Sequence, residues 1–89
     1  MTAQSPFLDF VAEEMYKRRY AKRTVETYLH WIRVYILFHK KQHPKDLAEQ
    51  HVEQFLTHLA VKQQVAVQTQ ALALNALSFL YKAILQQPL

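Results

Sequence analysis

Apolar side chains recur along this chain every three to four residues, which is the period of an amphipathic helix. No stretch shows the two-residue alternation that is typical of a half-buried strand. The pattern predicts four helices, over residues 5–19, 22–41, 49–63 and 67–86. Because the connections between them are only a few residues long, we expect one compact, mostly antiparallel, all-α domain over residues 1–89.

The ends of the first two helices carry recognisable signals. Ser5 is the expected N-cap of the first helix, and Pro6 suits its first position because the missing N–H costs nothing there. The second helix is expected to keep Lys40 and Lys41 in its last turn, where cations are favourable. Pro44 forbids its continuation, so residues 42–48 are expected to form a connector.

The last two helices differ in how far their apolar surface extends. In the third, Val52, Phe55 and Leu59 mark a single apolar stripe. In the fourth, Ala and Leu cover most of the circumference, which predicts burial on three sides. Its remaining polar strip is formed by Gln68, Asn75, Ser78 and Lys82.

Composition narrows the kinds of turn and site that are available. The 89 residues include no glycine and no cysteine, so we expect no positive-φ turns, no disulfides and no thiolate metal site. The start of the chain, residues 1–4, lacks the regions of a signal peptide, and no apolar run approaches the roughly 20 residues of a membrane span. We expect a cytoplasmic protein that has no membrane partner.

Charge is strongly segregated along the sequence. Residues 17–45 hold nine of the eleven basic residues and one acid, a net +8, whereas the rest of the chain is −4. This asymmetry indicates a polyanionic partner, although a solvated basic face that only maintains solubility is an equally good interpretation of charge alone.

Candidate chemistry is sparse. His39 and His43 are the nearest pair of metal ligands, but Pro44 follows and two lysines lie between them, so we expect no metal site. Ser5 and Ser78 show no accompanying base and oxyanion pattern. We therefore expect no catalytic residue, no cofactor and no small-molecule substrate.

The polar side of the second helix is more informative. Arg23, Thr27, His30 and Lys41 are spaced to share one side, with Arg33 beside them. Arg, Thr and Lys side chains bond phosphates and base edges, whereas a merely solvated face more often carries Glu and Lys pairs. The aromatic residues of this helix are interpreted as core rather than as a base-stacking platform, because they lie at helical spacing beside isoleucines.

Five segments resemble the N-terminal core-binding domain of tyrosine recombinases, and within that family the integron integrases. They are PFLD at 6–9, RRYAKRTVETY at 18–28, WIRVYILFHKKQHP at 31–44, VEQFLTHLA at 52–60 and VAVQTQALALNALSFLY at 65–81. The segment at 31–44 is the most specific of them. The resemblance implies a four-helix orthogonal bundle of the SAM-like type.

The resemblance also implies a function. Such a domain forms half of a clamp around a recombination site and enters the major groove through its second and fourth helices, while the catalytic arginines, histidines and tyrosine follow in a C-terminal domain that this chain lacks. The expected partners are DNA and other recombinase protomers. The candidate DNA-binding residues are Lys22, Arg23, Thr24, Thr27, His30, Arg33, Lys40, Lys41, Gln68, Thr69, Gln70, Asn75, Ser78 and Lys82.

An alternative function remains open at this point. Val34, Leu37, Leu72 and Phe79 could instead dock a partner protein, in which case the chain would be a helical protein-interaction module and its basic stretch incidental.

Overall fold

A computed structural model describes residues 5–87 and 89 of the chain. Residues 1–4, on which the signal-peptide expectation depends, lie outside this range, as does residue 88. The all-α prediction is confirmed, and the described residues contain no strand. The elements are α1 (Pro6–Lys17), α2 (Lys22–Phe38), the 3₁₀ turn η1 (Pro44–Asp46), α3 (Glu49–Val61), α4 (Val67–Phe79) and the π-helical turn η2 (Leu80–Ile84).

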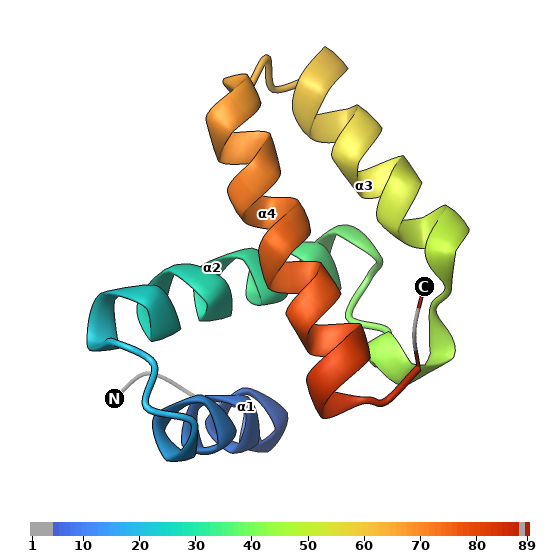
Figure 1. Cartoon of the computed structure of the whole chain (residues 1–89). Coiled ribbons are helices and arrows are strands. Elements are labelled where there is room, and N and C mark those ends of the chain that lie inside the picture. The colour runs from blue at the N-terminus through green and yellow to red at the C-terminus, as the bar shows by residue number, and fades with distance from the viewer. Residues whose placement is uncertain (1–4, 88) are drawn as a thin grey trace.

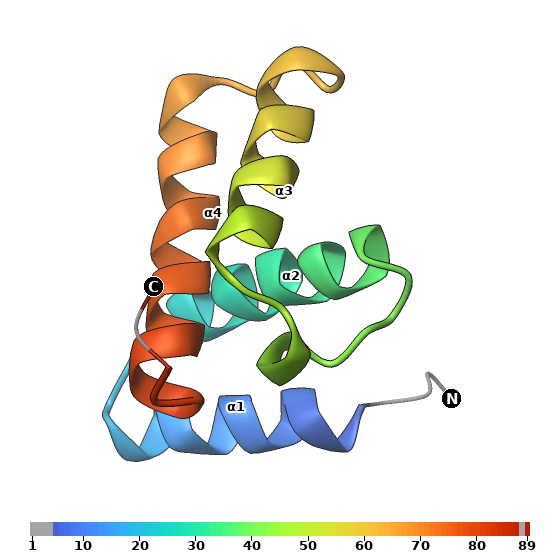
Figure 2. The same cartoon turned by 90° about the vertical axis from the view of Figure 1, so that its right-hand side faces the viewer.

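The helices cross at steep angles. Figures 1 and 2 show α3 and α4 side by side and antiparallel, with α2 crossing α4 and α1 lying across the far end of the bundle. The steep crossing of α2 and α4 confirms the orthogonal arrangement, while α3 and α4 pair antiparallel. The contact between α2 and α4 is the most extensive of any two helices. No helix within residues 5–87 has the length and apolar character that a membrane crossing requires.

All four helices contribute to a single core, as their apolar stripes predict. Its fully or nearly fully buried residues are Val11, Met15, Val25, Ile32, Tyr35, Leu47, Val52, Phe55, Leu59, Ala73, Leu77, Leu80 and Tyr81. Burying a large apolar side chain stabilises a fold by roughly 1.5–3 kcal/mol. Packing of this kind therefore holds the helices together without disulfides.

A buried pair of phenols joins α2 to η2 and to the connector. The hydroxyls of Tyr35 and Tyr81 lie 3.0 Å apart, and the Tyr81 hydroxyl donates to the Pro44 carbonyl at 2.7 Å. Since the Tyr81 proton is used in that bond, the Tyr35 hydroxyl must donate to Tyr81. Burial raises the pKa of Tyr35, and the bond to Tyr81 raises it further. Burial also raises the pKa of Tyr81, while its bond with Tyr35 acts in the opposite direction. Both phenols remain neutral.

Positive-φ turns occur despite the absence of glycine, so that expectation was wrong. The residues with positive φ are Arg19, Lys40, Lys41, Gln64 and Gln86. A left-handed residue with a Cβ costs roughly 1–2 kcal/mol, and hydrogen bonds at the helix ends offset part of that cost. At the end of α1, for example, the turn lets the Tyr20 N–H donate to the Met15 carbonyl at 3.1 Å, which satisfies a helix-end acceptor.

The same device ends α2 earlier than the sequence predicts. The helix stops at Phe38, and the N–H groups of Lys40 and Lys41 fold back onto the carbonyls of Leu37 and Ile36 at 3.1 and 2.8 Å. This is the hydrogen-bond pattern of a Schellman motif. The prediction that both lysines belong to the last helical turn is therefore wrong.

The predicted N-cap of α1 is confirmed, because the Ser5 hydroxyl accepts the Leu8 N–H. Ala21, Ala48 and Ala66 precede α2, α3 and α4, and none can accept a bond through its side chain. At the start of α3, His51 partly replaces the missing side-chain cap, because its Nδ1 accepts the Ala48 N–H at 2.9 Å.

The fourth helix is less buried than predicted. Leu72 and Leu74 are 43% and 41% exposed, so burial on three sides is wrong. The regular helix also ends at Phe79 rather than near Gln86, and continues as the π turn η2, in which the Leu85 N–H bonds the Leu80 carbonyl five residues back.

Candidate nucleic-acid interface

The first turns of α2 bring four candidate residues together. Lys22, Arg23, Thr27 and His30 line one shallow hollow together with Glu26. Arg23 and His30 are exposed, whereas Thr27 is half-buried. The helix has no acidic residue in its first turn and no side-chain cap, so cations stand at its positive end. That arrangement is unfavourable for an isolated helix and favourable for binding an anion.

The remaining basic candidates of α2 do not extend this hollow. Arg33 is exposed, but it lies more than two helical turns after Arg23. Lys40 and Lys41 are also exposed, but they follow the end of the helix in the left-handed turn, so Lys41 does not share the helical side with His30 as the sequence predicted.

The polar strip of α4 lies on the surface as the sequence predicted. Gln68, Asn75 and Ser78 are exposed along α4, and Lys82 is exposed on the η2 turn that continues it. Thr69 is half-buried beside the strip. The last α4 candidate, Gln70, is also half-buried, and its side-chain amide donates to the Val65 carbonyl at 2.8 Å. The Gln70 side chain therefore stabilises the turn before α4.

The two polar faces meet only along their edges. Tyr35 of α2 and Tyr81 of η2, which continues α4, face each other in the core, so the outermost surfaces of α2 and α4 point away from each other. The edges come together where the rings of Tyr28 and Phe79 lie 5.8 Å apart. Half-buried Thr24 lies one turn before Tyr28, and exposed Asn75 lies one turn before Phe79. Burial raises the pKa of Tyr28, with the nearby Tyr20 adding to the effect.

An arginine that was not among the candidates lies at this meeting point. The Arg18 guanidinium carbon stands 5.8 Å from the centroid of the Phe79 ring. The Tyr20 ring also contacts Phe79, at 5.3 Å. Arg18 belongs to the basic stretch, but its 61-residue separation from Phe79 leaves no trace in a pattern of local periodicity.

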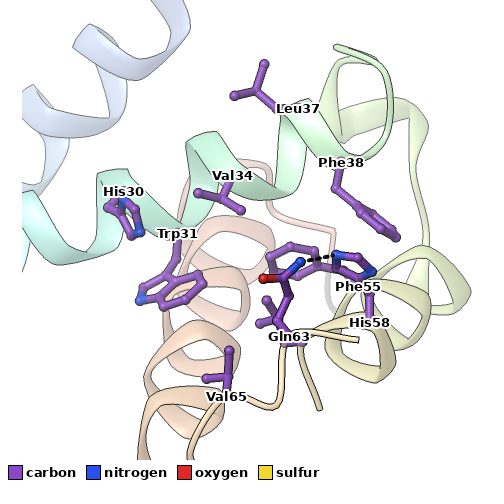
Figure 3. A pocket seen from close by; sticks show the side chains of 10 residues that line it. His30, Trp31, Val34, Leu37, Phe38, Phe55, His58, Gln63 and Val65 are labelled. Atoms are coloured by element: carbon purple, nitrogen blue, oxygen red, sulfur yellow. Dashed lines mark hydrogen bonds between the residues drawn. The ribbon is translucent and has the colours of Figure 1, made fainter. Parts of the chain in front are cut away.

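A second surface feature is an apolar groove between α2 and α3 (Figure 3). Trp31, Phe38 and Phe55 form its aromatic wall, and the groove has a volume of about 490 Å³. Its other lining residues are His30, Val34, Leu37, His58, Leu59, Gln63 and Val65. Val34 and Leu37, two residues of the alternative docking surface, therefore border a real depression. Phe79, the fourth residue of that surface, packs instead against Tyr20 and Tyr28.

Comparison with known proteins places the chain in a family. Residues 7–89 match the model for the phage integrase N-terminal SAM-like domain. The chain belongs to this family. It is 41% identical over 78 residues to a protein named integrase/recombinase from Escherichia coli, and equally so to one of the same name from Pseudomonas aeruginosa. Each match covers 88% of this chain and 23% of the relative, so the chain spans about a quarter of the length of those proteins.

The family match includes every candidate residue of the integrase domain, since all of them lie between 22 and 82. The tyrosine recombinase resemblance is thereby supported at the level of the N-terminal domain, together with the SAM-like fold.

The side chains of two histidines stabilise the connector between α2 and α3 in the integrase domain. The His39 Nε2–H donates to the His51 carbonyl at 2.9 Å, and the His43 Nδ1 accepts the Lys45 N–H at 3.1 Å. His51 is half-buried. Over the part of the chain that the structure describes, no three His, Asp or Glu side chains gather as a metal site would require.

Proposed function

We propose that this domain binds double-stranded DNA as the core-binding part of a site-specific tyrosine recombinase of the integron integrase type. The observation that carries the proposal is the meeting of the polar edges of α2 and α4 at Tyr28 and Phe79, where Tyr28 lies within the chain's strongly basic stretch. Two helix edges that meet at an angle present hydrogen-bonding groups to a duplex from two directions.

The side chains divide into two roles. Lys22, Arg23 and Arg33 are suited to phosphates, as are Lys40 and Lys41 from their exposed turn. Thr24 and Thr27 on α2, with Gln68, Asn75 and Ser78 on α4 and Lys82 on η2, are suited to base edges and the sugar–phosphate backbone. His30 and half-buried Thr69 lie beside these groups. Gln70 contributes by holding the start of α4.

Catalysis by such a recombinase belongs to a further, C-terminal domain. The relatives named integrase/recombinase are about four times as long as their matched portion, which leaves room for that domain in those proteins. Integron type is inferred from the segment at 31–44, and other protomers of the recombinase are its expected protein partners.

The first test neutralises Lys22 and Arg23 together by Lys22→Ala and Arg23→Ala. Each lost phosphate contact lowers the magnitude of the slope of log K against log salt by about 0.9. The slope of the double variant should therefore be smaller in magnitude by about 1.8. Its affinity deficit should then be roughly twelvefold larger at about 50 mM than at about 200 mM salt.

Fluorescence anisotropy with a labelled mixed-sequence duplex measures both slopes. The matched control is Lys45→Ala with Lys62→Ala, which removes equal charge from η1 and from the end of α3. The control should change the slope much less. If the two double variants behave alike, or if the Lys22 and Arg23 variant retains the original slope, the proposed contacts are wrong.

The groove between α2 and α3 favours a second function, the docking of a partner protein. Its aromatic wall would accept an apolar side chain, and Leu37 at its border is 50% exposed. Replacing Phe38 with Ala should abolish such an interaction and leave the salt dependence of DNA binding unchanged.

A further inference from the structure

Arg18 occupies the point at which α1 ends and the edges of α2 and α4 converge. It is the C-cap residue of α1, and its N–H bonds the carbonyls of Glu14 and Met15 at 3.2 and 3.1 Å. Its side chain is 41% exposed. The guanidinium is therefore accessible while its backbone is fixed by the end of the helix.

Two contacts hold the Arg18 guanidinium over α4. One is the face of the Phe79 ring, within the range of a cation–π interaction. The other is Glu14, whose Oε1 lies 3.9 Å from Nη1, at the outer limit of an ion pair. The second oxygen of Glu14 lies 3.2 Å from the Lys17 ammonium, so one carboxylate serves two cations. The excess positive charge remains available to an anion.

The Phe79 ring is itself fixed in position. It packs against Tyr20 at 5.3 Å and Tyr28 at 5.8 Å, and these two rings lie 6.2 Å from each other. The aromatic cluster Tyr20–Tyr28–Phe79 thus joins the turn after α1, the middle of α2 and the end of α4. A guanidinium lying over one of its rings keeps most of its five N–H donors for an external acceptor.

We propose that Arg18 is a DNA-phosphate-binding residue and that Phe79 is its positioning residue. The inference rests on the proposed function, and it adds a contact that links the basic stretch to the polar strip of α4. Phosphate is the expected ligand because an arginine fork matches its geometry and because most protein–DNA hydrogen bonds go to the sugar–phosphate backbone.

The neighbouring Arg19 provides a matched control. It carries the same charge one residue away and is exposed, but its backbone turns into the left-handed region at φ 65°. The structure gives Phe79 a cation–π contact with Arg18. If the contribution of Arg18 comes only from the general field of the basic stretch, Arg18→Ala and Arg19→Ala should have equal effects.

The experiment measures the affinity of the whole chain for a fluorescein-labelled, mixed-sequence DNA duplex between about 50 and 200 mM salt. Arg18→Ala should lower the slope of log K against log salt by about 0.9, so its affinity deficit should be about 3.5-fold larger at the lower salt concentration. Arg18→Lys should keep the slope and lose affinity, because an ammonium cannot reproduce the fork. Arg19→Ala should change the slope by less than half as much as Arg18→Ala.

Phe79→Leu tests the positioning role. Combined with Arg18→Ala, it should cost less affinity than the two single losses predict by addition, because each change disables the same contact. Additive losses would overturn the role of Phe79. Thermal unfolding of each variant separates loss of binding from loss of fold, and the DNA-induced shift of the Arg18 Nε–Hε signal reports the contact in the unaltered protein.

The possible failures are distinguishable. An unaltered chain that binds the duplex while Arg18→Ala keeps its slope, or lowers it no more than Arg19→Ala, overturns the assignment of Arg18 alone. An unaltered chain that does not bind the duplex overturns both this assignment and the proposed function.

Discussion

Replacement of Tyr81 by Phe should destabilise the domain more than its small change in volume suggests. The Tyr81 hydroxyl donates to the Pro44 carbonyl and accepts from Tyr35, and all three groups are buried. Without it, the carbonyl and the Tyr35 hydroxyl both lack partners. A buried polar group left unpaired costs about 1–3 kcal/mol, so the free energy of unfolding should fall by at least about 2 kcal/mol. For a domain of this size that loss lowers Tm by about 8–16 °C.

The geometry makes a sharper prediction about the partner substitution. Tyr35→Phe leaves the Tyr81 bond to Pro44 intact, so it should cost only about 0.5–1.5 kcal/mol. The double variant leaves a single unpaired carbonyl, and it should therefore be more stable than Tyr81→Phe alone. Removing the Tyr35 hydroxyl from the Tyr81→Phe variant should thus restore part of the stability that Tyr81→Phe removed.

Urea unfolding followed by circular dichroism measures these differences. Tyr16→Phe is the control, because Tyr16 is 50% exposed and its hydroxyl should contribute less than about 0.5 kcal/mol. Equal losses for Tyr35→Phe and Tyr81→Phe, or a double variant that is the least stable of the three, would refute the direction of hydrogen bonding that we derive.

Three further predictions concern pH and helix ends. The folded pKa of Tyr35 and of Tyr81 is raised above the ordinary value of 10.0, so the unfolded chain releases these protons first and the free energy of unfolding should fall as pH rises beyond 10. Denaturation at several alkaline pH values should show a shallower loss in Tyr35→Phe. Ala21→Ser should stabilise α2 by about 0.5–2 kcal/mol in the same assay, because it supplies a side-chain N-cap. Ala21→Asp should also stabilise the helix, but its negative charge should weaken binding to duplex DNA. A purely structural role for this turn would not give that combination. His51→Ala should cost about 0.5–1.5 kcal/mol of stability, because the Ala48 N–H loses its partner, and a variant as stable as the original would show that this bond contributes nothing.

Local sequence signals predicted the helices well. Ser5 followed by Pro6 marked the start of α1, and the spacing of Val52, Phe55 and Leu59 marked the buried side of α3. These features depend on residues a few positions apart, so the sequence contains the whole signal. The family resemblance then gave the orthogonal arrangement, which periodicity alone did not.

The failures came from effects that local patterns do not carry. Lys40 and Lys41 take up left-handed conformations because the Schellman bonds offset part of the cost, and nothing in two adjacent lysines indicates this. The Tyr35–Tyr81 bond joins residues 46 apart, and the Arg18–Phe79 contact likewise depends on the tertiary fold. Residue types identified the polar edges of α2 and α4, but only their crossing shows where the edges meet.

The measurement that tests the central claim most directly is a titration of the ¹⁵N-labelled chain with duplex DNA, followed by amide chemical shifts. We predict that the largest shifts lie along the edges of α2 and α4 around Thr24, Thr27 and Asn75, with smaller ones at the end of α1 near Arg18. Shifts confined to the groove around Trp31 and Phe38, or to the outer faces of α1 and α3, would contradict the proposed interface.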